Sequence, residues 1–151
     1  MPEKNPHLIF QKYGQTFILI NSIEFLLEIL LHKKGGLYKL DQRLKGKILE
    51  HATLGKKIEF SKGLIDDNEV KSQLTELNKR RRKIAHKWLT PFSGDGTDDW
   101  VFIGGGNIAE KLDEDFFEKT IELADSIIKK LIPISEVKNI EYKGIKQNHI
   151  A

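Results

Sequence analysis

The stretch DDNEVKSQLTELNKRRRKIAHKWLT, residues 66–90, decides the fold, because it has the periodicity of a long amphipathic helix. Its apolar residues recur at about 100° per residue and form one stripe, made of Leu74, Leu77, Ile84, Ala85 and Trp88. Asp66 can cap this helix, and Glu69 three residues later completes a capping-box arrangement. Thr90-Pro91 stops it, since the residue before a proline avoids helical geometry. We therefore predict a helix from Asp66 to about Leu89.

Two further long helices are predicted, one before this stretch and one after it. The first runs from about Leu8 to Lys33 and ends at Gly35-Gly36, where glycines act as C-terminal breakers. Its apolar residues cover most of its circumference, a pattern that suits a helix packed on two sides. The last helix begins at the cap Asp113 and is terminated by Pro133.

The segments between and after these helices are shorter. A second helix is expected from about Asp41 to Thr53, with a break at Leu54-Gly55 and a short helical piece through residues 56–62. Gly63 is expected to separate that piece from Leu64-Ile65. Residues 134–151 are polar and predict a short helical turn and then a frayed tail.

Residues 88–106 differ from the rest of the chain. Two short apolar runs, Trp88–Phe92 and Trp100–Ile103, flank a stretch rich in Gly, Asp and Ser, which predicts either a β-hairpin or an ordered loop. We therefore predict one helical domain over residues 1–151, with its core at about 8–132. Its fold class is mainly all-α, a four- to five-helix bundle with a small insertion.

Composition excludes several classes of protein. The chain has 151 residues, no cysteine and a net charge of +3, which fits one domain and excludes disulfides and thiolate metal sites. The apolar segment Phe17–Leu31 is interrupted by Asn21, Ser22, Glu24 and Glu28, so we expect a core helix rather than a membrane span. We expect a cytoplasmic protein that does not associate with membranes.

No metal site or cofactor is expected. The histidines outside the helix of residues 66–89 lack ligand-like spacing; they are His7, His32, His51 and His149. The acidic residues Asp95, Asp98 and Asp99 lack the regular spacing and distal Glu of an EF-hand, so a solvated turn is expected there. Gly104-Gly105-Gly106 is not followed by the Gly-Lys-Ser/Thr of a phosphate-binding loop.

Five consecutive cationic residues, Lys79 to Lys83, lie within the helix predicted over residues 66–89. Arg81 comes seven residues after Leu74 and four after Leu77, which places it near the middle of the apolar stripe. A guanidinium there needs a carboxylate, a phosphate or an interface. The carboxylate could be Glu24 or Glu28 in the core, in which case Arg81 is structural.

The same helix offers parts suited to cleaving RNA without a metal. Asn78, Arg82 and His86 form an i, i+4, i+8 row beside Arg81. The imidazole of His86 could take the proton from a ribose 2′-hydroxyl or protonate the leaving oxygen. Guanidiniums such as that of Arg81 could hold the phosphate and stabilise its developing charge. The alternatives are a solvated basic face and a structural histidine.

The run Leu74–His86 resembles the signature helix of the HEPN superfamily, in which an Arg, four to six residues and a His follow a hydrophobic approach, with Ile-Ala or Leu-Ala before the His. The resemblance covers about residues 8–132, including the segment Ala52–Ile58. It implies a helical bundle that dimerises with the two Arg-His motifs facing a shared cleft. Many HEPN domains are metal-independent ribonucleases of toxin–antitoxin, abortive-infection or CRISPR systems, and others are binding modules.

Carried over to this chain, the resemblance implies Arg81 and His86 as catalytic residues, or Arg80 with His86 at a longer spacing. RNA-binding residues would be Lys79, Arg80, Arg82 and Lys83, and possible orienting residues would be Asn78, Glu24 and Glu28. Family members usually carry a small polar residue after the Arg, where this chain has Arg82.

Two functions are expected on these grounds. The first is a toxin- or defence-type endoribonuclease that leaves a 2′,3′-cyclic phosphate, forms a homodimer and has an antitoxin or regulatory protein as partner. The second is a non-catalytic regulator that binds RNA or protein, because the chain also resembles the mannitol-operon repressor type of helical protein, with its Leu-Gly and Arg-x-x-x-Ala-His layout.

Overall fold

The computed structural model describes residues 6–35, 52–92, 99–104, 110–136, 140–142 and 145–147. Its elements are α1 (His7–Lys33), α3 (Leu54–Ser61), the 3-10 turn η2 (Lys62–Leu64), α4 (Asn68–Ile84), β1 (Trp88–Phe92), β2 (Asp99–Ile103), α5 (Glu114–Ile134), β3 (Ile140–Tyr142) and β4 (Ile145–Gln147). A mainly helical fold with a small antiparallel hairpin was predicted and is confirmed. The helix predicted over residues 41–53 lies outside the described residues, apart from Ala52 and Thr53, which are not helical.

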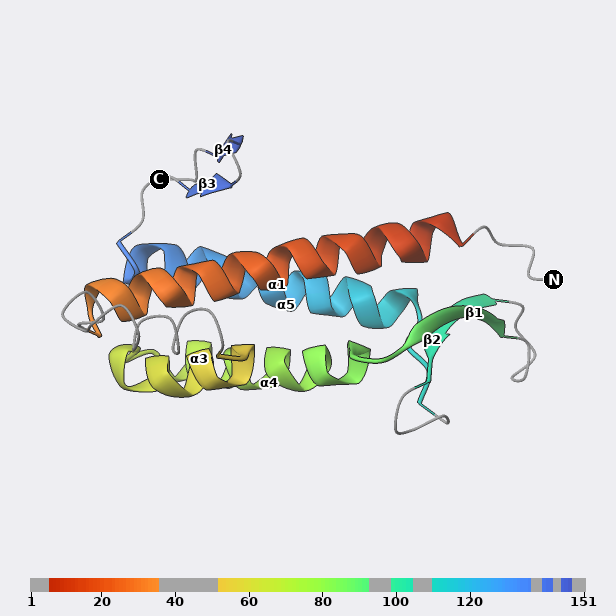
Figure 1. Cartoon of the computed structure of the whole chain (residues 1–151), viewed down its shortest axis with the longest axis horizontal. Helices are drawn as coiled ribbons and strands as arrows, with labels where there is room; N and C mark the ends of the chain where they lie inside the picture. The colour runs from red at the N-terminus through yellow and green to blue at the C-terminus, as the bar shows by residue number, and fades with distance from the viewer. Residues whose placement is uncertain are drawn as a thin grey trace.

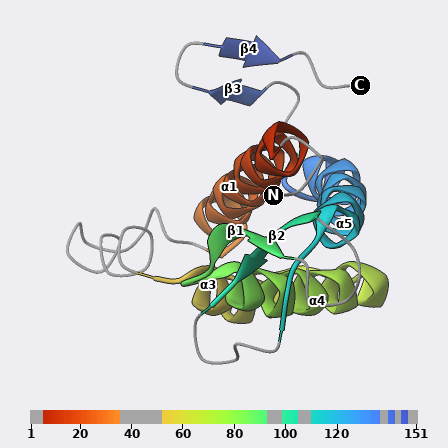
Figure 2. The same ribbon diagram turned by 90° about the vertical axis from the view of Figure 1, so that its right-hand side faces the viewer.

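The helices pack around one core. α1 and α5 run side by side over the greatest length, while α3 and α4 lie on the other side of the core (Figures 1 and 2). Leucine and isoleucine dominate this core because helix stripes of that kind bury apolar area with well-defined rotamers. Its fully buried members include Ile23, Leu26, Leu27, Leu30, Leu54, Leu74, Leu77, Ile127 and Leu131.

A second, aromatic cluster lies at the hairpin end of the bundle. Tyr13 of α1 stacks on Phe102 of β2 with ring centroids 4.6 Å apart, and Phe117 of α5 meets both rings edge-on. Phe102 and Leu112 exchange backbone hydrogen bonds of 2.8 Å in both directions. The hairpin is therefore attached to α1 by packing and to the start of α5 by backbone pairing.

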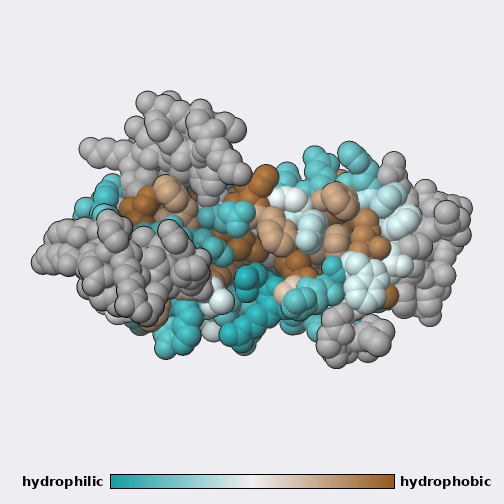
Figure 3. Space-filling view, viewed as in Figure 1, coloured by the Kyte–Doolittle hydropathy of each residue, from teal (hydrophilic) through white to brown (hydrophobic). Residues whose placement is uncertain are grey.

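The outer side of α1 carries apolar side chains at helical spacing. Phe10, Phe17, Ile18 and Phe25 are between 37% and 63% exposed, and apolar surface lies along the middle of the face shown in Figure 3. Packing on two sides was predicted for this helix; within the described residues it packs mainly on α5 and α3, and these four side chains remain exposed. α1 is also long and apolar enough to cross a membrane, a test that core helices of soluble proteins and signal sequences pass as well.

Helix boundaries differ from the predictions by a few residues. Asp67, rather than Asp66, caps α4, its carboxylate accepting hydrogen bonds from the amides of Glu69 and Val70. Leu54 and Gly55 begin a helix instead of breaking one, because the Thr53 hydroxyl accepts from the amide of Lys56 and caps α3.

The remaining corrections concern Gly63, Pro133 and the C-terminal segment. Gly63 lies inside η2, and Pro133 is the next-to-last residue of α5 rather than its stop. A short hairpin, β3–β4, occupies part of the segment for which a frayed tail was predicted, and it lies outside the helical bundle (Figure 2). Isoleucine and tyrosine favour strands, and only Lys143 and Gly144 separate β3 from β4 in the sequence.

Candidate functional site

The helix carrying the basic run ends sooner than predicted. α4 ends at Ile84, Ala85 takes an extended conformation, and His86 has a φ of 66°, in the left-handed region. The amide of Lys87 donates to the carbonyl of Ile84 and closes this turn. The prediction that His86 extends the helical row of Asn78 and Arg82 was therefore wrong: His86 lies exposed in the turn between α4 and β1.

Arg81 lies in the last turn of α4, on the side facing α1, and is half-buried. A hollow of about 150 Å³ lies beside it. Residues of α1 and of the end of α4 line this hollow: Phe17, Ile20, Asn21, Glu24, Arg81, Ile84 and Ala85. Among the described residues, no hydrogen bond or ion pair engages Arg81. Its guanidinium therefore keeps its capacity to bind an anion.

The carboxylates considered for Arg81 are paired with a lysine instead. Lys57 Nζ lies 2.7 Å from Glu28 Oε1 and 3.4 Å from Glu24 Oε2, and its side chain is only 5% exposed. Burial by itself lowers the pKa of Lys57, but the hydrogen bond and charge of Glu28, followed by those of Glu24, outweigh it and raise that pKa. The core ion pair proposed for Arg81 is thus wrong, although Glu24 and Arg81 line the same hollow.

The neighbouring Arg80 points to the other side of α4. Its Nη1 donates to the carbonyl of Phe116 at 3.3 Å and to Thr120 Oγ1 at 3.0 Å, and its guanidinium lies over the Phe116 ring. Its Nε lies 3.4 Å from Glu76 Oε1, a charge contact without hydrogen-bond geometry. Arg80, predicted to bind RNA, is thus engaged in packing α4 on α5.

The other predicted residues divide between surface and interior. Lys79 and Arg82 are exposed, and Lys83 is half-exposed with its Nζ 3.3 Å from Glu110 Oε1. Asn78 is half-buried against Gly55, where a Cβ would lie 3.1 Å from Asn78 Nδ2. The exposed cations and His86 therefore gather toward the C-terminal end of α4, whereas Asn78 lies at the contact with α3.

Two residues that were not predicted, Lys57 and Lys87, and one that was partly misplaced, Trp88, shape this region. Lys57 shares a buried stripe with Leu54, Ile58 and Ser61, a spacing that could have revealed it. Lys87 Nζ donates to the carbonyls of Gly104 and Glu110, at 3.1 and 3.2 Å, and so fixes the turn of His86. Trp88 was placed both on the apolar stripe of the helix and at the start of a hairpin or loop; it begins the strand β1 and is 58% exposed, so the helical placement was wrong.

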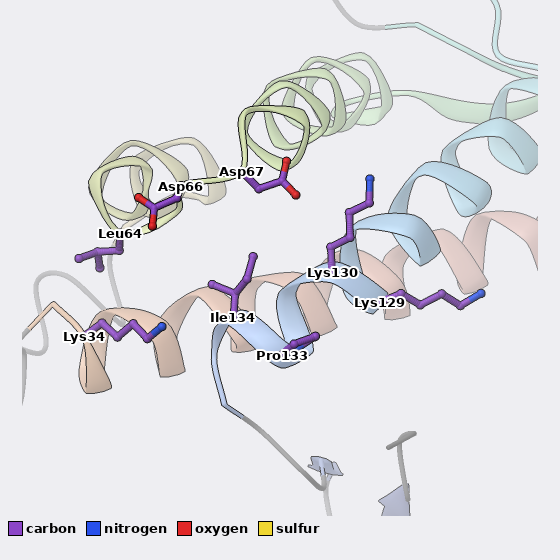
Figure 4. Close-up of a pocket in the computed structure, with 8 residues that line it drawn as sticks. All are labelled: Lys34, Leu64, Asp66, Asp67, Lys129, Lys130, Pro133 and Ile134. Atoms are coloured by element: carbon purple, nitrogen blue, oxygen red, sulfur yellow. The ribbon is translucent and has the colours of Figure 1, made fainter.

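A larger hollow, of about 480 Å³, lies at the end of the bundle away from the β1–β2 hairpin (Figure 4). Its lining residues are Lys34, Leu64, Asp66, Asp67, Lys129, Lys130, Pro133 and Ile134. Lys130 pairs with Glu69 at 2.8 Å and Lys129 with Asp125 at 2.9 Å. Because its cations are paired and its lining has both signs, this hollow favours no particular ligand.

Within the described residues, no group of three or more His, Asp or Glu side chains is placed to hold a metal ion. The acidic residues 95 and 98 and the glycines 105 and 106 lie outside the described residues, and so do the histidines 51 and 149. Comparisons with protein-family models, with curated proteins and with solved structures give no match for this chain.

Proposed function

We propose that this protein is a HEPN-like, metal-independent endoribonuclease of a toxin or defence system. In this proposal His86 acts as general acid or base, and Arg81 holds the scissile phosphate. The observation that carries the proposal is the state of Arg81, a half-buried guanidinium with no partner among the described residues, five positions before an exposed imidazole.

The chemistry depends on those two groups. Attack by the neighbouring 2′-hydroxyl needs a proton acceptor and, at the leaving oxygen, a proton donor, and an imidazole serves in either role. Charge develops on the phosphate in the transition state, where a preorganised guanidinium stabilises it. The product is a 2′,3′-cyclic phosphate.

A second candidate is a non-catalytic RNA- or protein-binding regulator. It is favoured by the surroundings of His86, because no hydrogen bond from a described residue orients this side chain. A general base usually has a third group that holds it. Arg82, where a small polar residue is usual, favours the same alternative.

The proposal includes a homodimer in the cytoplasm. The exposed apolar face of α1, made of Phe10, Phe17, Ile18 and Phe25, supports it, since exposed apolar patches mark interaction sites. Phe17 also lines the hollow beside Arg81, so a second copy covering this face would approach the proposed site. Most soluble oligomers are homo-oligomers, and two-fold dimers are the commonest.

The deciding experiment is an RNA cleavage assay on the purified chain in EDTA, with the products analysed for a 2′,3′-cyclic phosphate. Cleavage by the wild type and a loss of about 10²–10⁴-fold in His86→Ala are expected, the usual contribution of general acid–base catalysis. Arg81→Ala is expected to lose activity through the transition state, so kcat falls more than KM rises.

Two controls belong to this assay. Lys62→Ala removes an exposed cation from η2, which precedes the N-terminal end of α4 rather than the end that carries Arg81, and should keep wild-type cleavage. Circular dichroism should show that Arg81→Ala is folded. Cleavage that survives in His86→Ala rejects the mechanism, and a wild type that binds RNA without cleaving it establishes the regulator instead.

A further inference from the structure

Trp88 is an exposed indole held in a fixed place. The register of β1 and β2 puts Leu89, Trp100 and Phe102 on one face of the hairpin, where they pack on the aromatic cluster. Alternation along the strand puts Trp88 on the opposite face. Its side chain is 58% exposed.

Gly104 supports one side of the ring. A Cβ at this glycine would lie 2.2 to 2.5 Å from three atoms of the six-membered ring of Trp88, so the indole rests directly against the Gly104 backbone. Gly104 has a φ of 114°, a conformation that favours glycine. The ring is thus backed by main chain on one side while most of its surface remains open.

Exposed cations lie on the helix that leads into the strand of Trp88. Trp88 comes two residues after His86 and begins the strand that leaves the basic end of α4, where Lys79 and Arg82 are exposed. The carboxylate of Glu110, which lies at this end, is already paired with Lys83. An aromatic ring beside a cationic track is the arrangement by which proteins hold single-stranded nucleic acids, because bases stack and phosphates pair.

We propose that Trp88 is a stacking platform for an unpaired base of single-stranded RNA, next to the phosphate held at the end of α4. This inference deepens the proposed function and rests on it: the substrate class becomes single-stranded rather than duplex RNA. A base within a duplex is already stacked on its neighbours and does not offer its face to an indole.

Fluorescence of Trp88 tests the inference without any cleavage. The chain has two tryptophans, so Trp100→Phe leaves Trp88 as the reporter. The probe is a short 2′-O-methyl oligoribonucleotide, which lacks the free 2′-hydroxyl needed for cleavage, titrated as a single strand and as a duplex. We expect the single strand to quench the emission and the duplex to leave it unchanged.

Affinity measurements on variants of the otherwise wild-type chain complete the test. Trp88→Ala should weaken binding of the single strand about 5- to 100-fold, the usual effect of losing one base–aromatic stack. Trp88→Phe should retain part of the affinity. The matched control is Phe60→Ala, which removes another exposed aromatic side chain, 47% exposed on α3, and should have no effect.

The outcomes separate the two proposals. RNA binding that is unchanged in Trp88→Ala, with no quenching, overturns the stacking platform and leaves the ribonuclease intact. Equal quenching by the duplex overturns the choice of single strands. If the emission maximum of Trp88 moves to shorter wavelength as the protein concentration rises and does not change on addition of RNA, Trp88 lies in a protein–protein contact and the inference is overturned. No RNA binding by the wild type overturns both proposals.

Discussion

Backbone conformation at single residues determines the geometry of the hairpin end. His86 comes just before β1 and Gly104 just after β2, and both residues have positive φ. Lys87 Nζ links these two positions by donating a hydrogen bond to the Gly104 carbonyl. Glycine adopts this conformation without steric cost, whereas histidine does so at a cost that its surroundings must offset. The direction of Trp88 and of the proposed general base therefore depends on a few backbone angles.

Gly104→Ala should destabilise the protein by about 1–3 kcal/mol, because a side chain would be strained at this φ and would collide with the ring of Trp88. Gly63→Ala is the matched control, since a Cβ at Gly63 meets nothing within 4 Å. It should be neutral or stabilising by up to about 1 kcal/mol. Urea unfolding of the two variants measures both values, and equal stabilities would contradict the contact of Gly104 with Trp88.

The free energy of unfolding should depend strongly on the buried Lys57. Lys57→Met leaves Glu24 and Glu28 without their cation and should cost about 3 kcal/mol. Lys56→Met, at a neighbouring lysine paired on the surface with Glu59, should stay within about 0.5 kcal/mol. Adding Glu28→Gln to Lys57→Met should restore part of the loss, because it removes one uncompensated charge.

The pH dependence of this effect has a definite sign. The pKa of Lys57 is raised above its ordinary value of 10.5, so its contribution to stability is complete below pH 10.5 and is lost as pH rises through the folded-state value. The stability difference between the wild type and Lys57→Met should therefore shrink above that pH. A difference that grows there would show that Lys57 is held neutral.

At the scale of elements, the sequence predicted the bounds of α1 and α5 closely and the end of α4 poorly. Periodicity placed α1 and α5 to within about a residue at both ends, because their stripes are long, Gly35-Gly36 follows α1 and Asp113 caps α5. The end of α4 could not be predicted in this way. No glycine or proline marks residues 85–87, and the helix stops there because Trp88–Phe92 pairs with Asp99–Ile103.

The same tertiary pairing explains what was missed in the candidate site. The spacing of Arg81 relative to Leu77 correctly put it on a side of α4 that faces another helix. The position of His86 was wrong because it was deduced from a helix that had already ended. The partner of Glu24 and Glu28 was missed because the predicted break at Leu54-Gly55 separated Lys57 from Leu54, with which it shares the buried stripe of α3.

The N-terminus of α4 offers a matched test of capping. Asp67→Ala should cost about 1 kcal/mol, since the carboxylate accepts two backbone hydrogen bonds. Asp66→Ala removes the same charge one residue earlier, where no described residue pairs with it, and should stay within about 0.5 kcal/mol. Thermal unfolding distinguishes the two, and the reverse order would show that Asp66 is the cap.

At the scale of the whole molecule, the outer face of α1 predicts self-association. Ile18 is 63% exposed at the middle of that face, and Ile18→Glu would bury an unpaired charge in the proposed dimer. The dissociation constant of the dimer should rise by at least about tenfold, which corresponds to about 1.4 kcal/mol. Phe60→Glu on α3 is the control for charge and should leave the dimer unchanged. Sedimentation velocity of the wild type that shows monomer alone at micromolar concentration contradicts the dimer.

The reciprocal backbone pair between Phe102 and Leu112 has a consequence for how the molecule opens. A two-stranded hairpin alone is marginally stable in water, but this one is bonded along its second edge to the residue that precedes the cap of α5. The amides of Phe102 and Leu112 should therefore exchange with deuterated solvent at a common, slow rate, close to that of the α5 interior. The hairpin and the helices would then unfold as one cooperative unit, and the turn that carries His86 would be bounded on both sides by that unit.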